Sequence, residues 1–260
     1  GGCLGVSRGP STRRGRIRPP VGSGASRLTG PLADAVVLLR AAGVGAWTAD
    51  DPWPNEGTGG ATFDAAVADI TPVLSGGKFR NWNETSDLTV SAFEITDNDL
   101  WNPTLNVEAL TMAVDWQPLV ADDSMVLQHH DGGEGALMGA TAGWVMEMLD
   151  IPPYITAGVF SAKDTETGVG FVGNINQLST YSLERHLDVI RFDPVAEEVR
   201  WFRNGAKVDE VRGSTSGLGS MAPAPGRTLK LMNTCDVWAF AAWDRALTDA
   251  EVAALTPGLA

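Results

Sequence analysis

From about Ala46 onward, apolar and polar residues alternate in short runs along the chain. Alternation with a period of two is typical of strands that bury one face. Asp, Asn, Gly and Pro interrupt the runs roughly every 8–12 residues, a spacing that predicts an antiparallel sandwich of two sheets. We therefore predict strands at residues 45–49, 61–64, 87–95, 105–115, 123–129, 143–149, 154–161, 168–172, 177–184, 186–193, 199–204, 206–211, 228–232 and 235–243.

Two short helices are predicted outside this strand pattern. Near the C-terminus, Thr248 is placed as an N-cap and Glu251 stands three residues further on, which forms a capping box and predicts a helix over 248–255. A second helix is predicted over 31–42, where Gly43 follows as a stop signal and four apolar residues recur near helical spacing, namely Leu32, Val36, Leu39 and Ala42.

The segment 187–255 has the pattern of the last part of a β-sandwich. Two alternating runs flank Asn204-Gly205, a dipeptide suited to the φ > 0 positions of a type I′ hairpin turn. A strand-like segment follows at 228–232, and a longer one at 235–243 leads into the C-terminal helix.

This order of elements resembles the concanavalin A-like jelly roll of the laminin-G type. The family has a hairpin of the form wyvNG, then a strand, then a closing tail of the form aLs..Ei..L. The corresponding residues here are Trp201 to Gly205, Val237 to Trp243, and Ala246, Leu247, Thr248, Asp249, Glu251, Val252 and Leu255.

The resemblance covers about the last 70 residues, reaches back more loosely to Trp47, and includes nothing before Pro31. It implies an all-β, two-sheet antiparallel jelly-roll sandwich over 31–260. Lectins, adhesion modules, hydrolases and virion parts all use this sandwich, so the fold alone does not determine the function.

Composition agrees with one large β domain. A chain of 260 residues with 43% hydrophobic residues can bury a full core, and its 30 Gly and 15 Pro suit a turn-rich β protein. Cys3 lies near the N-terminus and Cys235 in a predicted strand, so no disulfide is implied. No apolar run approaches the ~20 residues that span a bilayer, and the first residues do not form a secretory signal, so we expect no membrane insertion.

Residues 1–30 form a basic arm on an acidic body. The arm has six Arg and no acidic residue, so it carries +6, whereas the remaining 13 basic and 32 acidic residues give −19. It is either a disordered tail or an anchor that orders against a neighbouring subunit or an acidic surface. Nucleic acid is not an expected partner, because no aromatic residues interleave with the Arg residues. The arm residues proposed for assembly are Arg8, Arg13, Arg14, Arg16 and Arg18.

No enzymatic activity is expected. The jelly-roll family includes glucanases with an E-x-D-x-x-E strand, whose acid and nucleophile lie about 5–5.5 Å apart for retaining chemistry. No such motif is present; Glu147 and Asp150 would face opposite sides of a strand, and Glu94 would face away from Asp97 and Asp99. A G-x-S-x-G nucleophile motif is also missing from the sequence.

Two metal sites come into consideration. His129-His130-Asp131 is the one His cluster, and its residues are interpreted as exposed polar turn residues, with transition-metal binding as the alternative. Laminin-G-like domains often hold Ca²⁺ at the rim of the sandwich through oxygen ligands, so the resemblance implies a calcium site. Its candidate ligands are Asp50, Asp51, Asp122 and Asp123, with Asp97 and Asp99 as further carboxylates. No other cofactor is required.

Nine Trp against two Tyr is an unusual aromatic balance. Trp201, Trp238 and Trp243 lie in predicted strands and are expected to pack in the core. Trp53 and Trp101 lie in polar loops, where they either pin the loop to the body or stack on a sugar ring. The candidate sugar-binding residues are Trp53, Asn55, Asp97, Asp99, Trp101 and Asn102.

Two non-enzymatic functions follow. The sandwich resembles domains of bacteriophage minor tail and capsid-decoration proteins, so the first is a structural virion component whose arm docks onto other virion subunits in an oligomeric assembly. The second is a lectin-like adhesion module that binds carbohydrate, including a host-surface glycan. The first places the chain in the virion, on the tail or capsid surface, and the second in an extracellular or cell-surface setting.

Overall fold

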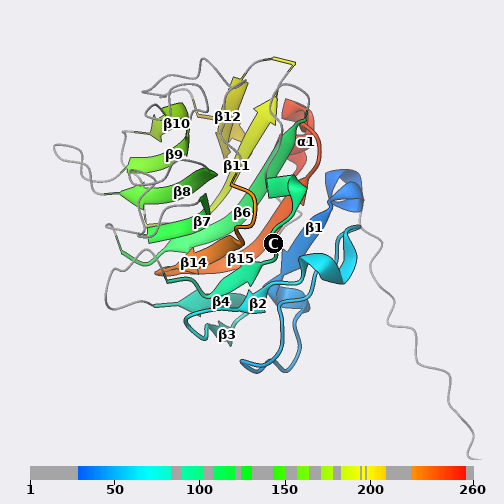
Figure 1. The fold of residues 1–260 in the computed structure, drawn as a ribbon, viewed down its shortest axis with the longest axis vertical. Helices are drawn as coiled ribbons and strands as arrows, with labels where there is room; N and C mark the ends of the chain where they lie inside the picture. The colour runs from blue at the N-terminus through cyan, green and yellow to red at the C-terminus, as the bar shows by residue number, and fades with distance from the viewer. Residues whose placement is uncertain are drawn as a thin grey trace, which may run out of the picture.

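Two antiparallel β-sheets packed face to face form the body of the protein in a computed structural model (Figure 1). It describes residues 29–82, 90–101, 108–120, 124–130, 143–149, 157–163, 171–177, 183–193, 195–196, 198–208 and 224–255. One sheet has eight strands in the order β13-β12-β11-β6-β15-β4-β3, with β1 also paired to β15. The other has seven, in the order β10-β9-β8-β7-β14-β5-β2. The predicted all-β, two-sheet antiparallel sandwich is thus confirmed.

The strands are short, and consecutive ones often belong to opposite sheets. Their bounds are β1 (Val37–Arg40), β2 (Ala66–Val67), β3 (Val73–Ser75), β4 (Lys78–Asn81), β5 (Phe93–Ile95), β6 (Leu110–Pro118), β7 (Ser124–His130), β8 (Gly143–Leu149), β9 (Ala157–Lys163), β10 (Phe171–Gln177), β11 (His186–Asp193), β12 (Glu198–Arg203), β13 (Ala206–Lys207), β14 (Leu229–Asn233) and β15 (Cys235–Trp243). The helical elements are the 3₁₀ turns η1 (Gly30–Asp34), η2 (Ala41–Gly43), η3 (Gly60–Phe63) and η4 (Asp99–Trp101), and the α-helix α1 (Asp249–Leu255).

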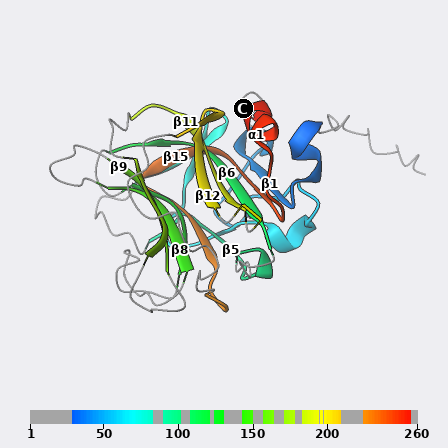
Figure 2. The same cartoon turned by 90° about the horizontal axis from the view of Figure 1, so that it is seen from above.

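Strand β6 shows how sequence alternation builds the two apolar layers. Met112, Val114 and Trp116 belong to the main core between the sheets, whereas Ala113 belongs to a second cluster on the outer face. Helix α1 and turn η1 cover this outer cluster and lie beside each other on one side of the sandwich (Figure 2). The cluster therefore joins the first described residues to the last ones.

The predicted helix over 31–42 is wrong; the segment contains η1, strand β1 and η2. Val37 and Leu39 enter the core between the sheets, and Leu38 enters the outer cluster. An apolar run buried on both faces cannot be assigned to helix or strand by periodicity. The pairing partner decides here: β1 adds to β15 with Val37 opposite Ala242.

The structure confirms two other local predictions, the hairpin turn and the helix cap, and contradicts two predicted strands. Asn204 and Gly205 have φ values of 49° and 79°, as a type I′ turn requires. Helix α1 has the predicted capping box, in which the Glu251 N–H donates to Thr248 Oγ1 at 3.2 Å. The predicted strand at 45–49 is not formed, the one at 61–64 is turn η3, and the hairpin β3–β4 was not predicted. No helix in the described ranges is long and apolar enough to cross a membrane.

Candidate functional site

A pocket of about 530 Å³ opens beside the sandwich core, between η3, η4, the segment before β6 and the turn after β15. Val36, just before β1, also lines it, so five segments drawn from both ends of the described chain meet there and the pocket is a product of the sheet topology. A volume in this range is typical of small-molecule sites. Its lining residues are Val36, Phe63, Asn98, Asp99, Leu100, Glu108, Ala109, Asp244 and Arg245.

A buried tryptophan holds the η4 wall of the pocket. Trp101 is fully buried, and its ring contacts that of Phe63 edge-on, with 6.0 Å between ring centroids. Asn98 starts the turn, because its Oδ1 accepts the Leu100 N–H at 3.0 Å and its carbonyl accepts the Trp101 N–H at 3.0 Å. Asp99 lies between these fixed residues and is exposed.

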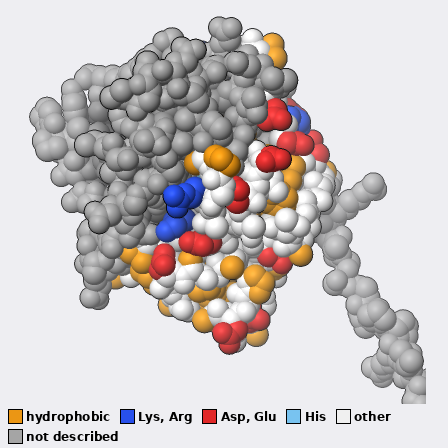
Figure 3. Space-filling view, viewed as in Figure 1, with side chains coloured by type: hydrophobic (Ala, Val, Ile, Leu, Met, Phe, Trp, Pro, Cys, Tyr) orange, Lys and Arg blue, Asp and Glu red, His pale blue; other side chains and the backbone are white. Residues whose placement is uncertain are grey.

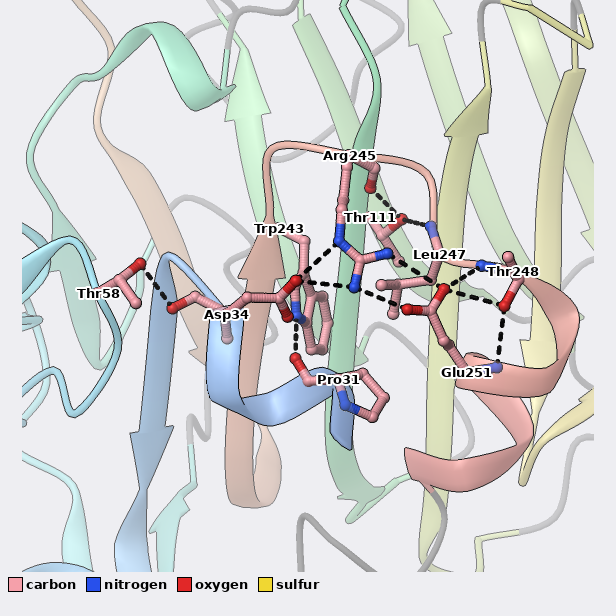
Figure 4. A network of polar contacts seen from close by, with 10 residues as sticks. Pro31, Asp34, Thr58, Thr111, Trp243, Arg245, Leu247, Thr248 and Glu251 are labelled. Carbon is pink, nitrogen blue, oxygen red and sulfur yellow. Dashed lines mark hydrogen bonds and ion pairs between the residues drawn. The ribbon is translucent and has the colours of Figure 1, made fainter. Parts of the chain in front are cut away.

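A network of ion pairs holds the opposite wall, the turn after β15 (Figure 4). The Arg245 guanidinium donates to Asp34 Oδ2 at 3.0 Å and to the two Glu251 oxygens at 2.8 and 3.1 Å. The backbone carbonyl of Arg245 accepts a hydrogen bond from the Thr111 hydroxyl at 2.7 Å. Trp243 Nε1 donates to the Pro31 carbonyl at 2.7 Å. The wall is thereby tied to η1, β6 and α1.

The network changes the proton affinities of its members. The hydrogen bonds from Arg245 and from the Thr248 N–H lower the pKa of Glu251 to about 2, although partial burial opposes this. The hydrogen bond to Glu251 in turn raises the pKa of Arg245. Both groups are charged over the whole physiological range, so the wall keeps its ion pairs.

The pocket combines carboxylates with an apolar wall. Asp99, Glu108 and Asp244 are exposed, and Arg245 is the cation among the described lining residues. Across the described part of the face in Figure 3, acidic side chains are spread widely, whereas Lys and Arg gather in small patches. Val36, Phe63, Leu100 and Ala109 supply the apolar part. Hydroxyl-rich ligands with apolar ring faces suit such a surface.

Of the two roles predicted for Trp53 and Trp101, burial of their rings supports pinning of the loop and not stacking on a sugar. Both residues have 0% relative exposure. The Trp53 ring packs against Phe79 and Phe93, with centroids 4.9 and 5.3 Å apart. A ring without an exposed face cannot stack on a sugar, so these two residues pin their loops to the core. Trp201 and Trp243 are buried as predicted, and Trp238 is half-buried beside the Arg185 guanidinium.

The Asn55 side chain forms hydrogen bonds with backbone groups of its own loop and of the chain at β1. Its Oδ1 accepts the Leu38 N–H at 2.7 Å, and its Nδ2 donates to the Val36 and Gly60 carbonyls at 3.2 and 3.0 Å. Together with the Glu56 and Gly59 N–H groups, which donate to β1 and the residue before it, this amide covers the free edge of β1.

The remaining predicted sugar-binding residues are separated. Asp97 accepts the Gly226 N–H at 2.6 Å, and Asp99 lines the pocket. Asn102 lies outside the described residues. Sequence reasoning therefore found one pocket carboxylate, Asp99, and missed Glu108, Asp244 and Arg245, which become neighbours only through the sheet topology.

The metal-site predictions are only partly covered by the described residues. Asp50 and Asp51 are exposed, and Asp51 Oδ2 accepts the Thr48 N–H and hydroxyl at 3.0 and 2.9 Å. Asp122 and Asp123 lie outside the described residues, so the calcium site stays a prediction. In the part of the chain that is described, no three His, Cys, Asp or Glu residues form a group that could hold a metal ion.

The interpretation of the His cluster as exposed turn residues is wrong for His129. This residue is fully buried in β7, with its ring centroid 5.8 Å from that of Trp144. The His130 side chain and Asp131 lie outside the described residues. The basic arm, with Arg8, Arg13, Arg14, Arg16 and Arg18, lies outside them as well.

The two-sheet sandwich of this chain is similar in fold to several solved structures. It is similar to the binding domain of botulinum neurotoxin serotype G, with a TM-score of 0.58 and 12% identity over 86% of this chain and 50% of that one. It is also similar to the binding domain of Paraclostridial Mosquitocidal Protein 1 (TM-score 0.56, 14% identity, 86% and 52% covered). The match to Trypanosoma rangeli sialidase has a TM-score of 0.54 and 9% identity, with 88% and 33% covered.

These similarities show the fold. The chain spans about half the length of the toxin binding domains and about a third of the sialidase. No family model and no curated protein matches the sequence.

Proposed function

We propose that this chain is a non-catalytic, lectin-like binding module whose pocket between η4 and the turn after β15 binds a saccharide. The observation that carries the proposal is the pocket itself. A space of about 530 Å³ brings three exposed carboxylates and an amide next to a wall of Phe63, Leu100 and Val36. Carboxylate and amide oxygens accept hydrogen bonds from sugar hydroxyls, and apolar side chains cover the C–H face of a sugar ring.

The solved structures support binding rather than assembly as the main role. They include a sialidase in complex with sialic acid, botulinum neurotoxin type C, whose cell entry depends on interaction with two ganglioside molecules, and a botulinum neurotoxin binding domain in complex with rat synaptotagmin II. Proteins that contain a sandwich of this fold thus include ones that bind glycans. The chain spans only part of these proteins, so the pocket of this chain is what specifies its ligand.

The structural role in a viral particle stays a prediction. None of the solved structures named above is a virion protein, and the arm predicted to dock onto virion subunits lies outside the described residues. A saccharide-binding module could serve on a virion or at a cell surface, so the two settings predicted from the sequence are both retained. Calcium is not assigned a part in the proposed pocket.

The test is binding of the full chain to a glycan array, followed by titration of the best hits against three variants. Asp99→Ala and Asp244→Ala each remove a pocket carboxylate, and Asp50→Ala removes an exposed carboxylate outside the pocket. We expect each pocket variant to weaken binding about two- to fivefold, because a hydrogen bond to an exposed carboxylate is worth up to about 1 kcal/mol. Asp50→Ala should bind as the unmodified protein does. An empty array, or equal affinity of all variants, would refute the proposal.

A further inference from the structure

The charge of the pocket restricts the class of saccharide that it can take. Asp99 and Asp244 are exposed lining residues, and within the described part of the chain neither carboxylate has a hydrogen-bond or ion-pair partner. Both carboxylates are therefore open to a ligand on the described side of the pocket. Glu108 adds a third carboxylate to the same lining.

The cation of the pocket does not offset these charges. Arg245 lies between Asp34 and Glu251, with N–O distances of 2.9 and 2.8 Å (Figure 4). Two carboxylates thus share one guanidinium, so the network around Arg245 itself carries a net charge of −1. An acidic sugar would have to break these ion pairs to reach the guanidinium.

We infer that the pocket selects basic saccharides, meaning amino sugars with a free protonated amine, over neutral ones, and neutral ones over acidic ones. This inference rests on the proposed function and specifies its ligand class. A protonated amine would pair with Asp99 or Asp244 and lose little solvation, because both carboxylates are exposed. A carboxylated, sulfated or sialylated sugar would meet like charges from two sides.

The strength of the selection follows from the exposure of the carboxylates. Ion pairs between exposed groups are worth up to about fivefold in affinity, and salt screens them over about 10 Å at 0.1 M. We therefore expect successive members of the series basic, neutral and acidic to differ by about two- to fivefold at low salt. The differences should shrink when the salt concentration is raised to about 1 M.

The experiment uses sugars that share ring stereochemistry and differ in charge through one substituent, an amine at C2 or a carboxylate at C6. Glucosamine, glucose and glucuronic acid form one series, and galactosamine, galactose and galacturonic acid form a second that covers the other common ring stereochemistry. Affinities for the full chain are measured by ligand-observed NMR at about pH 6, where amines are protonated and uronates are ionised. The same titrations are run with Asp99→Asn, Asp244→Asn and the double variant, and with Asp50→Asn as the single-charge control.

The expected result is the order basic, neutral, acidic, which the double variant flattens and the control retains. An acidic sugar that binds as tightly as its neutral counterpart would overturn the inference and leave the proposed function standing. An order that survives in the double variant would also overturn the inference and leave the proposed function standing. If no sugar of either series binds and the glycan array is also empty, the proposed function and this inference both fail.

Discussion

Arg245 and Glu251 are joined by two side-by-side hydrogen bonds of 2.8 and 3.1 Å, which fix helix α1 to the turn after β15. The same guanidinium also binds Asp34 in η1. Bidentate Arg–carboxylate pairs are geometrically specific, so a single side chain aligns the first and last described elements. The turn that carries Asp244 into the pocket depends on this alignment.

Replacing Glu251 with Gln should lower the stability of the protein in a pH-dependent way. The pKa of Glu251 is about 2 in the folded protein and 4.5 ordinarily, so the ionised group stabilises the fold fully above about pH 4.5. This contribution is lost as the pH falls from 4.5 towards 2, because the unfolded state then binds the extra proton. Since the side chain is 31% exposed, we expect a loss of only about 1 kcal/mol in Glu251→Gln at neutral pH.

The measurement is chemical denaturation of both proteins between about pH 3 and 7. The difference in unfolding free energy between them should be largest at neutral pH and should shrink towards pH 3. Asp50→Asn, in an exposed loop, should follow the unmodified protein at every pH. A constant difference across the range would mean that Glu251 acts through packing alone.

The fold class and the C-terminal elements could be predicted because their signals are local. A type I′ turn needs residues that accept positive φ, which Asn204 and Gly205 provide. The capping box of α1 is contained within the four residues from Thr248 to Glu251. Such features require no knowledge of the neighbouring chain.

Predictions failed where tertiary contacts decide between equal local alternatives. The apolar run at 36–39 fits a buried helix or a buried strand, and pairing with β15 selects the strand. Trp53 lies among polar residues, yet its backbone pairs with Ala65 and its ring enters the core. Asp244 and Glu108 come together because β6 and β15 are neighbours in one sheet, and Asp99 reaches them from η4, which follows β5 of the other sheet. Sequence spacing does not contain that information.

Replacing Asp236 with Ala should destabilise the protein strongly. The Asp236 side chain is fully buried and is bound by Lys78 and by Arg80, the latter through hydrogen bonds of 2.6 and 2.8 Å. Burial raises the pKa of Asp236, but the hydrogen bonds and charges of the two cations outweigh it and hold the pKa below its usual value. Removing one partner of a buried pair costs about 3 kcal/mol, and here slightly less because Arg80 is half exposed.

Arg80→Gln is the matched control for this pair, because Lys78 remains to neutralise the buried carboxylate. Denaturant midpoints should therefore rank the unmodified protein first, Arg80→Gln second and Asp236→Ala last. If the two variants were equally stable, Lys78 would contribute nothing to the burial of Asp236.

Cys235 should resist thiol reagents in the folded protein. The side chain is fully buried, and both this burial and the neighbouring Asp236 carboxylate raise the pKa of the thiol above its usual value. The reactive species is the thiolate, which is therefore neither populated nor accessible. Alkylation followed by peptide mass spectrometry should leave Cys235 unmodified in native buffer and modify it fully in denaturant. Rapid native modification would require β15 to open locally.

Substitutions of Trp53 separate a structural role of this tryptophan from a role in ligand binding. Its ring has 0% relative exposure and packs against Phe79 and Phe93, so Trp53→Ala should cost about 3–5 kcal/mol of stability through the cavity it leaves. Trp53→Phe keeps an aromatic ring in place and should cost less. Under conditions in which Trp53→Phe is fully folded, its affinity for the best saccharide from the glycan array should equal that of the unmodified protein. Weaker binding by folded Trp53→Phe would place the saccharide near this ring and away from the pocket that Asp99 and Asp244 line.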